Sequence, residues 1–299
     1  MNVTPSVGRS VNVDTVDQSF LFTVDVEDWF QVENFKPWIP FDSWPERELR
    51  VEKNIHRLLD LLEEGGLKRE ATFFVLGWIA ERYPHLVKEI HSRGHEIASH
   101  GFNHHLPTAQ TREALKADLI QSRELLEDQI GERVCGYRAP SFAVNDEILK
   151  IIQECGYLYD SSYNSFDRHG RYGQVDMSVY PRRGIAIELG NDFYELPVSN
   201  LHMKGQVVPW GGGGYFRMIP APIYAKGVTY HLKEKGAFVF YMHPWELDPG
   251  QPRVKEASRQ FKFRHYLNLN KAEMKTRTTM TALKRTSCVS LKQYLKALI

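Results

Sequence analysis

The sequence predicts an α/β fold in which parallel strands are wrapped by helices, as in an α/β barrel, and two observations carry that prediction. Short apolar runs alternate with helical stretches along most of the chain, and this β-then-α order favours parallel strands with helical crossovers. Polar residues repeatedly follow the apolar runs, at the strand ends where such barrels place their sites. At 299 residues with 42% hydrophobic content, the length allows either one barrel or two smaller domains. The pattern favours a single domain over 1–299.

Apolar runs of strand length recur from residue 19 onward. The first of them is rich in aromatic and β-branched residues, as expected of a buried strand. The expected strands are SFLFTVD (19–25), ATFFVLG (71–77), HEIASH (95–100), VCGYRAP (134–140), LYDSS (158–162), IAIELG (185–190), FYELPVS (193–199) and GAFVFYMHPWEL (236–247).

Helices are predicted between these strands from apolar spacing and from capping residues. They are expected from near Pro45 to Gly65-Gly66, up to Ser92, from about Thr111 to Ile130, from an N-cap at Asn145 to Glu154, and from about Ala221 to Lys235. The barrel core is expected over about 19–250. Residues from about 251 to 299 carry a weak helical pattern and are expected to close the same domain.

Composition excludes several classes of protein. The chain has 38 Lys and Arg against 37 Asp and Glu, which argues against nucleic-acid or membrane binding through bulk charge. The first eighteen residues lack the apolar stretch of a signal peptide, and no run approaches the roughly 18 apolar residues of a membrane span. A soluble, cytoplasmic protein is therefore expected. The cysteines Cys135, Cys155 and Cys288 are far apart and are expected to be core residues in a reducing compartment.

Three carboxylates, those of Asp25, Glu27 and Asp28, follow the first apolar run within four residues. Burying them is costly unless a cation or a proton compensates. The alternative is an acidic turn that leaves the strand into water.

Two histidines in SHGFNHH, His100 and His104, have the four-residue spacing that lets two imidazoles meet one metal ion. His91 and His95 have the same spacing, so context must decide. His100 ends a predicted strand and faces the rim where the first strand also ends, whereas His91 and His95 straddle a helix end and are expected to be surface or packing residues. His105 is expected to be a neighbour of the site or a surface residue.

Two histidines and a carboxylate leave coordination positions open for water and substrate, as a catalytic divalent metal needs. The sequence also offers Arg138, which can hold a carboxylate through a bidentate pair, and His243, which ends a buried strand. A satisfied core histidine and a surface arginine are the alternatives for these two residues.

Taken in order, the motifs TVDVED, SHGFNHH, YRAPSF and FYMHP resemble those of the polysaccharide deacetylases with a NodB homology domain, also called carbohydrate esterase family four. The likeness spans roughly 19–250. The segments DVEDWF, ELPVS, GGGGYFR and KFRHYLNL further resemble the subgroup found with bacterial exopolysaccharide gene clusters. The family fold is a distorted (β/α) barrel.

This resemblance implies a hydrolase that removes N-acetyl groups from acetylated amino sugars of a polysaccharide or its precursor, with a divalent metal, Zn²⁺ being favoured. It implies that Asp25 is the general base, that His100 and His104 are metal ligands, that Arg138 orients the base and that His243 is the general acid. Water would attack the acetamide carbonyl as Asp25 takes its proton, and His243 would protonate the departing amine.

The third metal ligand departs from the usual family pattern, in which two aspartates are adjacent, because Val26 follows Asp25 here. Strand alternation places Asp25 and Glu27 on one face, which favours Glu27. The shorter side chain of Asp28 suits the ligand role if the strand has already ended. Asp28 is the expected ligand and Glu27 the alternative.

The remaining expectations concern neighbours of the site and other functions. Asp160 in LYDSS is a candidate for tuning His243, and Tyr163 or Trp210 for lining a sugar pocket. One alternative function is hydrolysis of another amide, such as a cyclic ureide or imide. Another is a catalytically silent sugar-binding module, in which Trp29, Trp210 and Trp245 stack on sugar faces.

Overall fold

A computed structural model describes residues 18–64, 69–166 and 175–299 of the chain. Its strands are β1 Ser19–Val26, β2 Ala71–Val75, β3 Glu96–Ser99, β4 Gly136–Tyr137, β5 Tyr159–Asp160, β6 Arg182–Arg183, β7 Ala186–Gly190, β8 Phe193–Glu195, β9 Leu201–Met203, β10 Gln206–Val208 and β11 Ala237–Met242. Its α-helices are α1 Val51–Glu63, α2 Gly77–Arg82, α3 Pro84–Ser92, α4 Arg112–Ile130, α5 Asp146–Glu154, α6 Gly213–Met218, α7 Ala221–Lys235, α8 Arg259–Tyr266, α9 Leu269–Ala282 and α10 Leu291–Leu298. Short 3₁₀ helices include η1 Glu33–Phe35, η2 Phe41–Glu46 and η8 Pro244–Leu247.

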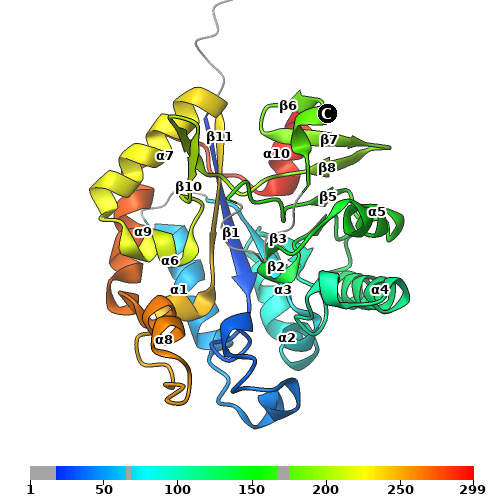
Figure 1. Cartoon of the computed structure of the whole chain (residues 1–299), viewed down its shortest axis with the longest axis vertical. Helices are drawn as coiled ribbons and strands as arrows, with labels where there is room; N and C mark the ends of the chain where they lie inside the picture. The colour runs from blue at the N-terminus through cyan, green and yellow to red at the C-terminus, as the bar shows by residue number, and fades with distance from the viewer. Residues whose placement is uncertain (1–17, 65–68, 167–174) are drawn as a thin grey trace, which may run out of the picture.

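The main sheet has nine strands in the order β11-β1-β2-β3-β4-β5-β8-β7-β6. The strands from β11 to β8 pair in parallel, and β7 and β6 add antiparallel pairs at one edge. Beyond β8 the chain turns back toward β11, where the Ser199 N–H donates to the Val239 carbonyl at 3.3 Å. The predicted α/β fold with a parallel, barrel-like central sheet is confirmed, and Figure 1 shows helices arranged around that sheet.

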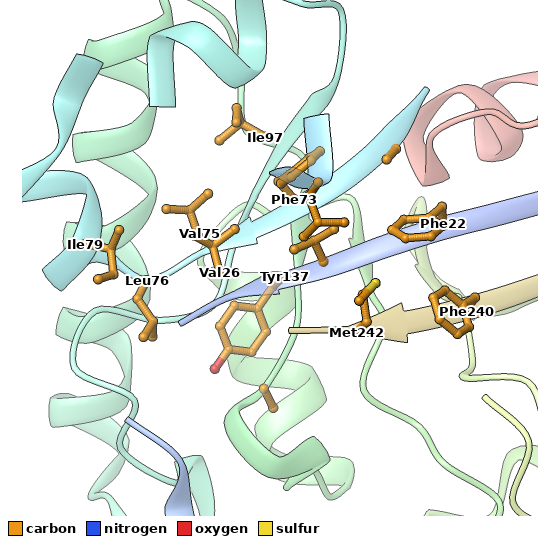
Figure 2. Close-up of a cluster of buried hydrophobic side chains, with 14 of the residues drawn as sticks. Phe22, Val26, Phe73, Val75, Leu76, Ile79, Ile97, Tyr137, Phe240 and Met242 are labelled. Carbon is orange, nitrogen blue, oxygen red and sulfur yellow. The ribbon is translucent and has the colours of Figure 1, made fainter. Parts of the chain in front are cut away.

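The alternation of β1 separates two hydrophobic clusters. Phe20, Phe22 and Val24 belong to the larger cluster, which includes apolar residues of α1 to α4 and α7. Figure 2 shows part of this cluster, with Phe22 and Val26 beside side chains of β2 and β11. Leu21 belongs to the second cluster, which Leu291 and Leu295 of α10 join. Because successive residues of a strand face opposite sides, Thr23 and Asp25 share the face of Leu21.

Capping residues placed several helices correctly. The Thr111 side chain accepts the Ala114 N–H at the start of α4, and the Asn145 side chain accepts the Ile148 N–H at the start of α5. The helix expected over 221–235 is α7. The matches at α4 and α5 reflect the need of the first N–H groups of a helix for an acceptor outside it.

The helix expected from near Pro45 begins later, because Pro45 lies in η2 and α1 starts at Val51. The N–H groups of Arg50 and Val51 donate to Asp28 Oδ2 at 2.6 and 2.9 Å, so the start of α1 is set by a carboxylate distant in sequence. The predicted stop at Gly65-Gly66 lies outside the described residues, as do residues 1–17. Within the described ranges, the helices are all too short or too polar to cross a membrane.

Candidate active site

The predicted site residues gather at the carboxyl ends of the parallel strands. Asp25 lies in β1, and Arg138 and His243 directly follow β4 and β11, while His100 directly follows β3. In Figure 1 the arrows of β1 and β11 point toward the same end of the molecule. A cavity of about 260 Å³ opens there, and its lining includes Asp25, Glu27, His100, His104 and His243.

His100, His104 and Glu27 form a group suited to a metal ion. One ligand atom from each lies within 4.8 Å of the others, and all three residues are buried. The His100 Nδ1 is 2.8 Å from the Arg138 carbonyl, so this nitrogen donates its proton and leaves Nε2 as the free ligand atom. Buried Glu27 Oε2 has no hydrogen-bond partner. Two neutral imidazoles and a carboxylate fit a divalent ion such as Zn²⁺ with open coordination positions. The Glu27 oxygens lie 3.2 Å from His104 Nε2 and 3.0 Å from His243 Nε2.

The carboxylate that lies with His100 and His104 is that of Glu27, the alternative, rather than that of Asp28, the expected third ligand. Asp28 Oδ1 accepts the Trp29 N–H at 2.8 Å, while Oδ2 accepts the two N–H groups that begin α1. Burial raises the pKa of Asp28 to about 6 despite these donors. Asp28 therefore holds the loop after β1 against α1. The strand alternation that favoured Glu27 continues one residue beyond β1, so that Asp25 and Glu27 both face the cavity.

Arg138 fixes the position and charge of Asp25. The fully buried guanidinium donates to Asp25 Oδ1 at 2.8 Å, to the Thr23 hydroxyl at 2.6 Å and to both the carbonyl and the hydroxyl of Ser161. Burial alone would raise the pKa of Asp25, but Arg138, His100 and His243 outweigh it and lower that pKa. Asp25 is thus an ionised carboxylate held in one orientation, as a general base requires.

His243 lies between the carboxylates of the cavity and a carboxylate behind it. Its Nε2 is 3.0 Å from Glu27 Oε1 and 3.9 Å from Asp25 Oδ2, and its Nδ1 is 2.9 Å from Glu246 Oε1. Burial lowers the pKa of His243, but Glu27 and Glu246 outweigh it and raise the pKa to about 10. A histidine that stays protonated at neutral pH is suited to the role of general acid.

Glu246, rather than Asp160, is the carboxylate that holds His243. Fully buried Glu246 accepts from Arg217 Nε at 2.7 Å, and Arg217 also donates to backbone carbonyls of the segment from α8 to α9. Asp160 instead accepts from the hydroxyl and N–H of Ser162 and faces Glu195. The sequence signal for Glu246 is its position three residues after His243, where a glutamate caps the short helix η8. Arg217, which comes from α6, has no such signal.

Of the aromatic residues expected to contact a sugar, Trp245 lines the cavity, and Trp29, Tyr163 and Trp210 do not. Trp210 is buried and stacks on Tyr224 with ring centroids 5.7 Å apart, and Trp29 is buried against Phe30. Neither presents a ring to a sugar, which removes two of the three platforms of a silent sugar-binding module. Tyr163 is absent from the cavity lining, whose aromatic members are Phe142, Tyr215, Tyr241, Trp245 and Phe263.

The three other histidines considered in the sequence, His91, His95 and His105, occupy the positions expected of surface and packing residues. His95 is buried and accepts the Ala71 N–H at 3.3 Å, whereas His91 lies 3.6 Å from Glu132 on the surface side of α3. His105 is exposed and packs against Phe41. The equally spaced pair His91 and His95 therefore has no part in the site.

Comparison with known families divides the chain in two. Residues 34–159 match the family model described as polysaccharide deacetylase, and residues 161–295 match a domain of unknown function, DUF3473. The first region contributes His100, His104 and Arg138. The second contributes His243 and Glu246, and its strand β11 pairs with β1. Both regions thus supply strands to one sheet and residues to one cavity.

Curated relatives agree with the first of these matches. The chain is 34% identical over 119 residues to a peptidoglycan-N-acetylglucosamine deacetylase of Bacillus cereus, covering 40% of this chain and 52% of the relative. It is 33% identical over 117 residues to a peptidoglycan deacetylase of Helicobacter pylori, covering 38% of this chain and 39% of the relative. The chain therefore spans about half or less of the length of these relatives.

A solved structure supports the fold over nearly the whole chain. The protein, from Mycobacterium smegmatis and assigned to the polysaccharide deacetylases, superimposes with a TM-score of 0.59 at 21% identity, covering 99% of this chain and 95% of its own. At that identity the likeness concerns the fold alone. The chain thus has the fold of this solved structure, and its residues 34–159 are similar to the polysaccharide deacetylase family.

Proposed function

We propose that this protein is a metal-dependent hydrolase that removes N-acetyl groups from acetylated amino sugars of a polysaccharide or its precursor. The observation that carries the proposal is the joining, in one cavity, of a metal-binding set with an acid and a base: Glu27, His100 and His104 lie beside the pair Asp25 and His243. The relative named as a peptidoglycan-N-acetylglucosamine deacetylase supports the acetamide of an amino sugar as the group that is cleaved.

Glu27, His100 and His104 would hold the divalent ion, with Zn²⁺ the proposed metal. A divalent ion bound there supplies Lewis acidity, which polarises the acetamide carbonyl and lowers the pKa of a water molecule. The Arg138 carbonyl, by accepting from His100 Nδ1, keeps the His100 Nε2 directed at the ion.

Asp25 and His243 would move the protons. Asp25, kept ionised by Arg138, takes a proton from the attacking water as the new bond to the carbonyl carbon forms. His243, kept protonated by Glu27 and Glu246, gives a proton to the sugar nitrogen as the carbon–nitrogen bond breaks. The products are acetic acid, which ionises to acetate, and a free amino sugar. Asp25 is then protonated and His243 is neutral.

We further propose a class of polymer as the substrate. The segments that resemble the exopolysaccharide-associated subgroup, DVEDWF, ELPVS, GGGGYFR and KFRHYLNL, support an exopolysaccharide or its precursor as the substrate. The cytoplasmic location expected from the sequence stays a prediction.

The test is acetate release from N-acetylglucosamine oligomers by the purified protein. We expect release that is lost on chelation and restored by Zn²⁺ or another divalent ion, and absent in Asp25→Asn. Hydrolysis of a cyclic ureide or imide without release from any acetylated sugar would contradict the proposal and favour the alternative amidase activity.

A further inference from the structure

Exposed large apolar side chains are concentrated in one part of the chain. Nine are exposed among the residues that the structure describes, and five of the nine belong to the helices α6 to α9: Met218, Ile223, Tyr230, Phe263 and Met274. Met218 and Phe263 line the catalytic cavity, and the other three do not. Single apolar residues on a surface need no explanation, whereas a group of them marks a surface that contacts something else.

The three outside the cavity stand on one face made by α7 and α9. The two helices share a shallow groove, whose lining includes Lys226, Tyr230, Thr278 and Ala282, and Figure 1 shows both on the same side of the sheet. Residues three or four apart lie on the same face of a helix. We call the following exposed residues the α7–α9 face: Ile223, Lys226, Tyr230, Lys233, Lys271 and Met274.

The apolar residues of the α7–α9 face project beside the groove rather than into it. Ile223 precedes Lys226 by three residues and Met274 precedes Thr278 by four, so they share the helix faces of the groove residues. Neither Ile223 nor Met274 lines the groove, and both are more than half exposed. The face is thus a broad surface with apolar side chains on both helices.

The α7–α9 face is basic in a protein that is nearly neutral. The segments 221–235 and 269–285 contain eight Lys and Arg against two Glu, whereas the whole chain has 38 against 37. Of the two glutamates, Glu273 is paired with two arginines, and Glu234 lies near the end of α7. The lysines of the face form no ion pair with the described residues. The balance of charge over the whole chain therefore hides a local positive surface.

Possible partners cover this face to different extents. A second copy of the chain would bring two basic faces together, and these would repel each other. A nucleic acid would neutralise the lysines but leave Ile223, Tyr230 and Met274 without an apolar contact. A single acidic helix in the groove would leave Ile223 and Met274 uncovered beside it. A bilayer that contains anionic lipids offers negative headgroups above an apolar layer, so it covers both kinds of residue.

We propose that the α7–α9 face binds the surface of a membrane that contains anionic phospholipids. The lysines would lie at the headgroups, and Ile223, Tyr230 and Met274 would insert between them. Met218, which lines the catalytic cavity, lies three residues before α7, so the bound face begins beside the rim of that cavity. This inference goes beyond the proposed function and does not depend on it.

Co-sedimentation of the full chain with lipid vesicles tests the inference. The protein should bind vesicles made of equal parts of phosphatidylcholine and phosphatidylglycerol, and it should not bind vesicles of phosphatidylcholine alone. Binding should weaken as NaCl rises from about 0.05 to about 0.5 M, because salt screens exposed charges. No binding, or equal binding to the two kinds of vesicle, would overturn the inference.

Two matched double variants locate the contact. Lys226→Gln with Lys233→Gln should lower the partition coefficient for the anionic vesicles roughly thirtyfold, because each lysine at such a surface contributes about a factor of five. The control, Lys88→Gln with Lys150→Gln, removes the same charge from exposed positions on α3 and α5 and should bind as the wild type does. Equal losses in the two variants would show that overall charge governs binding, and they would overturn the role of this face.

A third double variant tests the apolar contact. Ile223→Ser with Met274→Ser keeps every charge and should lower the partition coefficient roughly tenfold, since two partly buried side chains no longer insert. Unchanged binding would show that the lysines act alone, as they would toward any anionic polymer, and would overturn the membrane as the partner. A dimer in light scattering that Lys226→Gln with Lys233→Gln abolishes, without vesicle binding by the wild type, would instead identify a second copy as the partner.

Discussion

Two pairs of buried carboxylates lie at the carboxyl ends of strands in the same sheet, yet their protonation differs. Asp25 and Glu27, at the end of β1, face Arg138, His104 and His243, and these groups lower both carboxyl pKa values against the effect of burial. Asp160 and Glu195, at the ends of β5 and β8, receive hydrogen bonds from Ser162 and from backbone N–H groups.

In the second pair, burial raises both pKa values, and the neighbouring Asp160 raises the pKa of Glu195 further, to well above its usual range. Burial and the neighbouring Asp160 thus favour the protonated form of Glu195. The comparison teaches that a buried carboxylate becomes a base or a metal ligand only where positive groups keep it ionised. Elsewhere a proton takes the place of the cation.

The largest effect expected from this comparison is on turnover. Asp25→Asn keeps the shape of the side chain and its contact with Arg138 but removes the base, so kcat should fall by roughly 10²–10⁴-fold. Metal content measured by elemental analysis should stay unchanged, because Asp25 is outside the metal-binding set. Full activity in this variant would show that another group accepts the proton from water.

The choice of Glu27 over Asp28 as the metal ligand is tested by changing each of the two residues in turn. Glu27→Gln should weaken metal affinity by at least about a hundredfold, since a charged ligand is lost. Asp28→Ala should keep the metal but destabilise the fold by about 2 kcal/mol, because three backbone N–H groups lose their acceptor. Metal titration and urea unfolding of both variants decide the matter, and the reverse pattern would restore Asp28 as the ligand.

The sequence predicted the strand ends and most of the site, because alternation and capping are local. Asn145 caps its helix as the pattern indicated, and Thr111 caps the helix that was expected to start near it. The strand-end positions of His100 and His243 brought these two residues together. Asp28 was expected among the ligands, but its contacts come from a different segment of the chain. Its carboxylate is used by α1, whose N–H groups lie more than twenty residues away, and a sequence pattern does not show which distant donors reach a carboxylate.

The partner of His243 shows the same limit. Glu246 could be anticipated from the spacing of HPWE, but Arg217, which keeps it charged, comes from a different helix 29 residues away. Asp160 was expected near His243 from its place in LYDSS, yet it is paired with Glu195 across the β5–β8 contact. Which carboxylates are ionised depends on such long-range pairs and needed the structure.

A smaller loss of activity is expected from a change at Glu246. Like Asp25 and Glu27, this buried carboxylate is ionised, because Arg217 lowers its pKa against the effect of burial. Glu246→Gln keeps a hydrogen-bonding oxygen near His243 but removes the charge that favours its protonated form. We expect kcat to fall roughly ten- to a hundredfold with little change in KM, measured as initial rates of acetate release. Glu246→Asp should recover part of the loss if charge is what matters. Full activity in Glu246→Gln would indicate that the negative charge at this position does not matter.

The smallest effect concerns the second carboxylate pair and appears as a pH dependence of stability. Because the pKa of Glu195 is raised in the folded state, the folded protein holds a proton that the unfolded chain releases above about pH 4.3. The stabilisation from Glu195 is thus complete below that pH and declines as the pH rises. Glu195→Gln keeps a donor toward Asp160 and needs no proton, so its free energy of unfolding relative to the wild type should increase by about 1–2 kcal/mol from pH 5 to pH 8. Urea unfolding of both proteins at the two pH values measures this difference. If the relative stability stays constant, Glu195 is ionised in the folded protein, as Asp25 and Glu27 are, and the two carboxylate pairs do not differ in protonation.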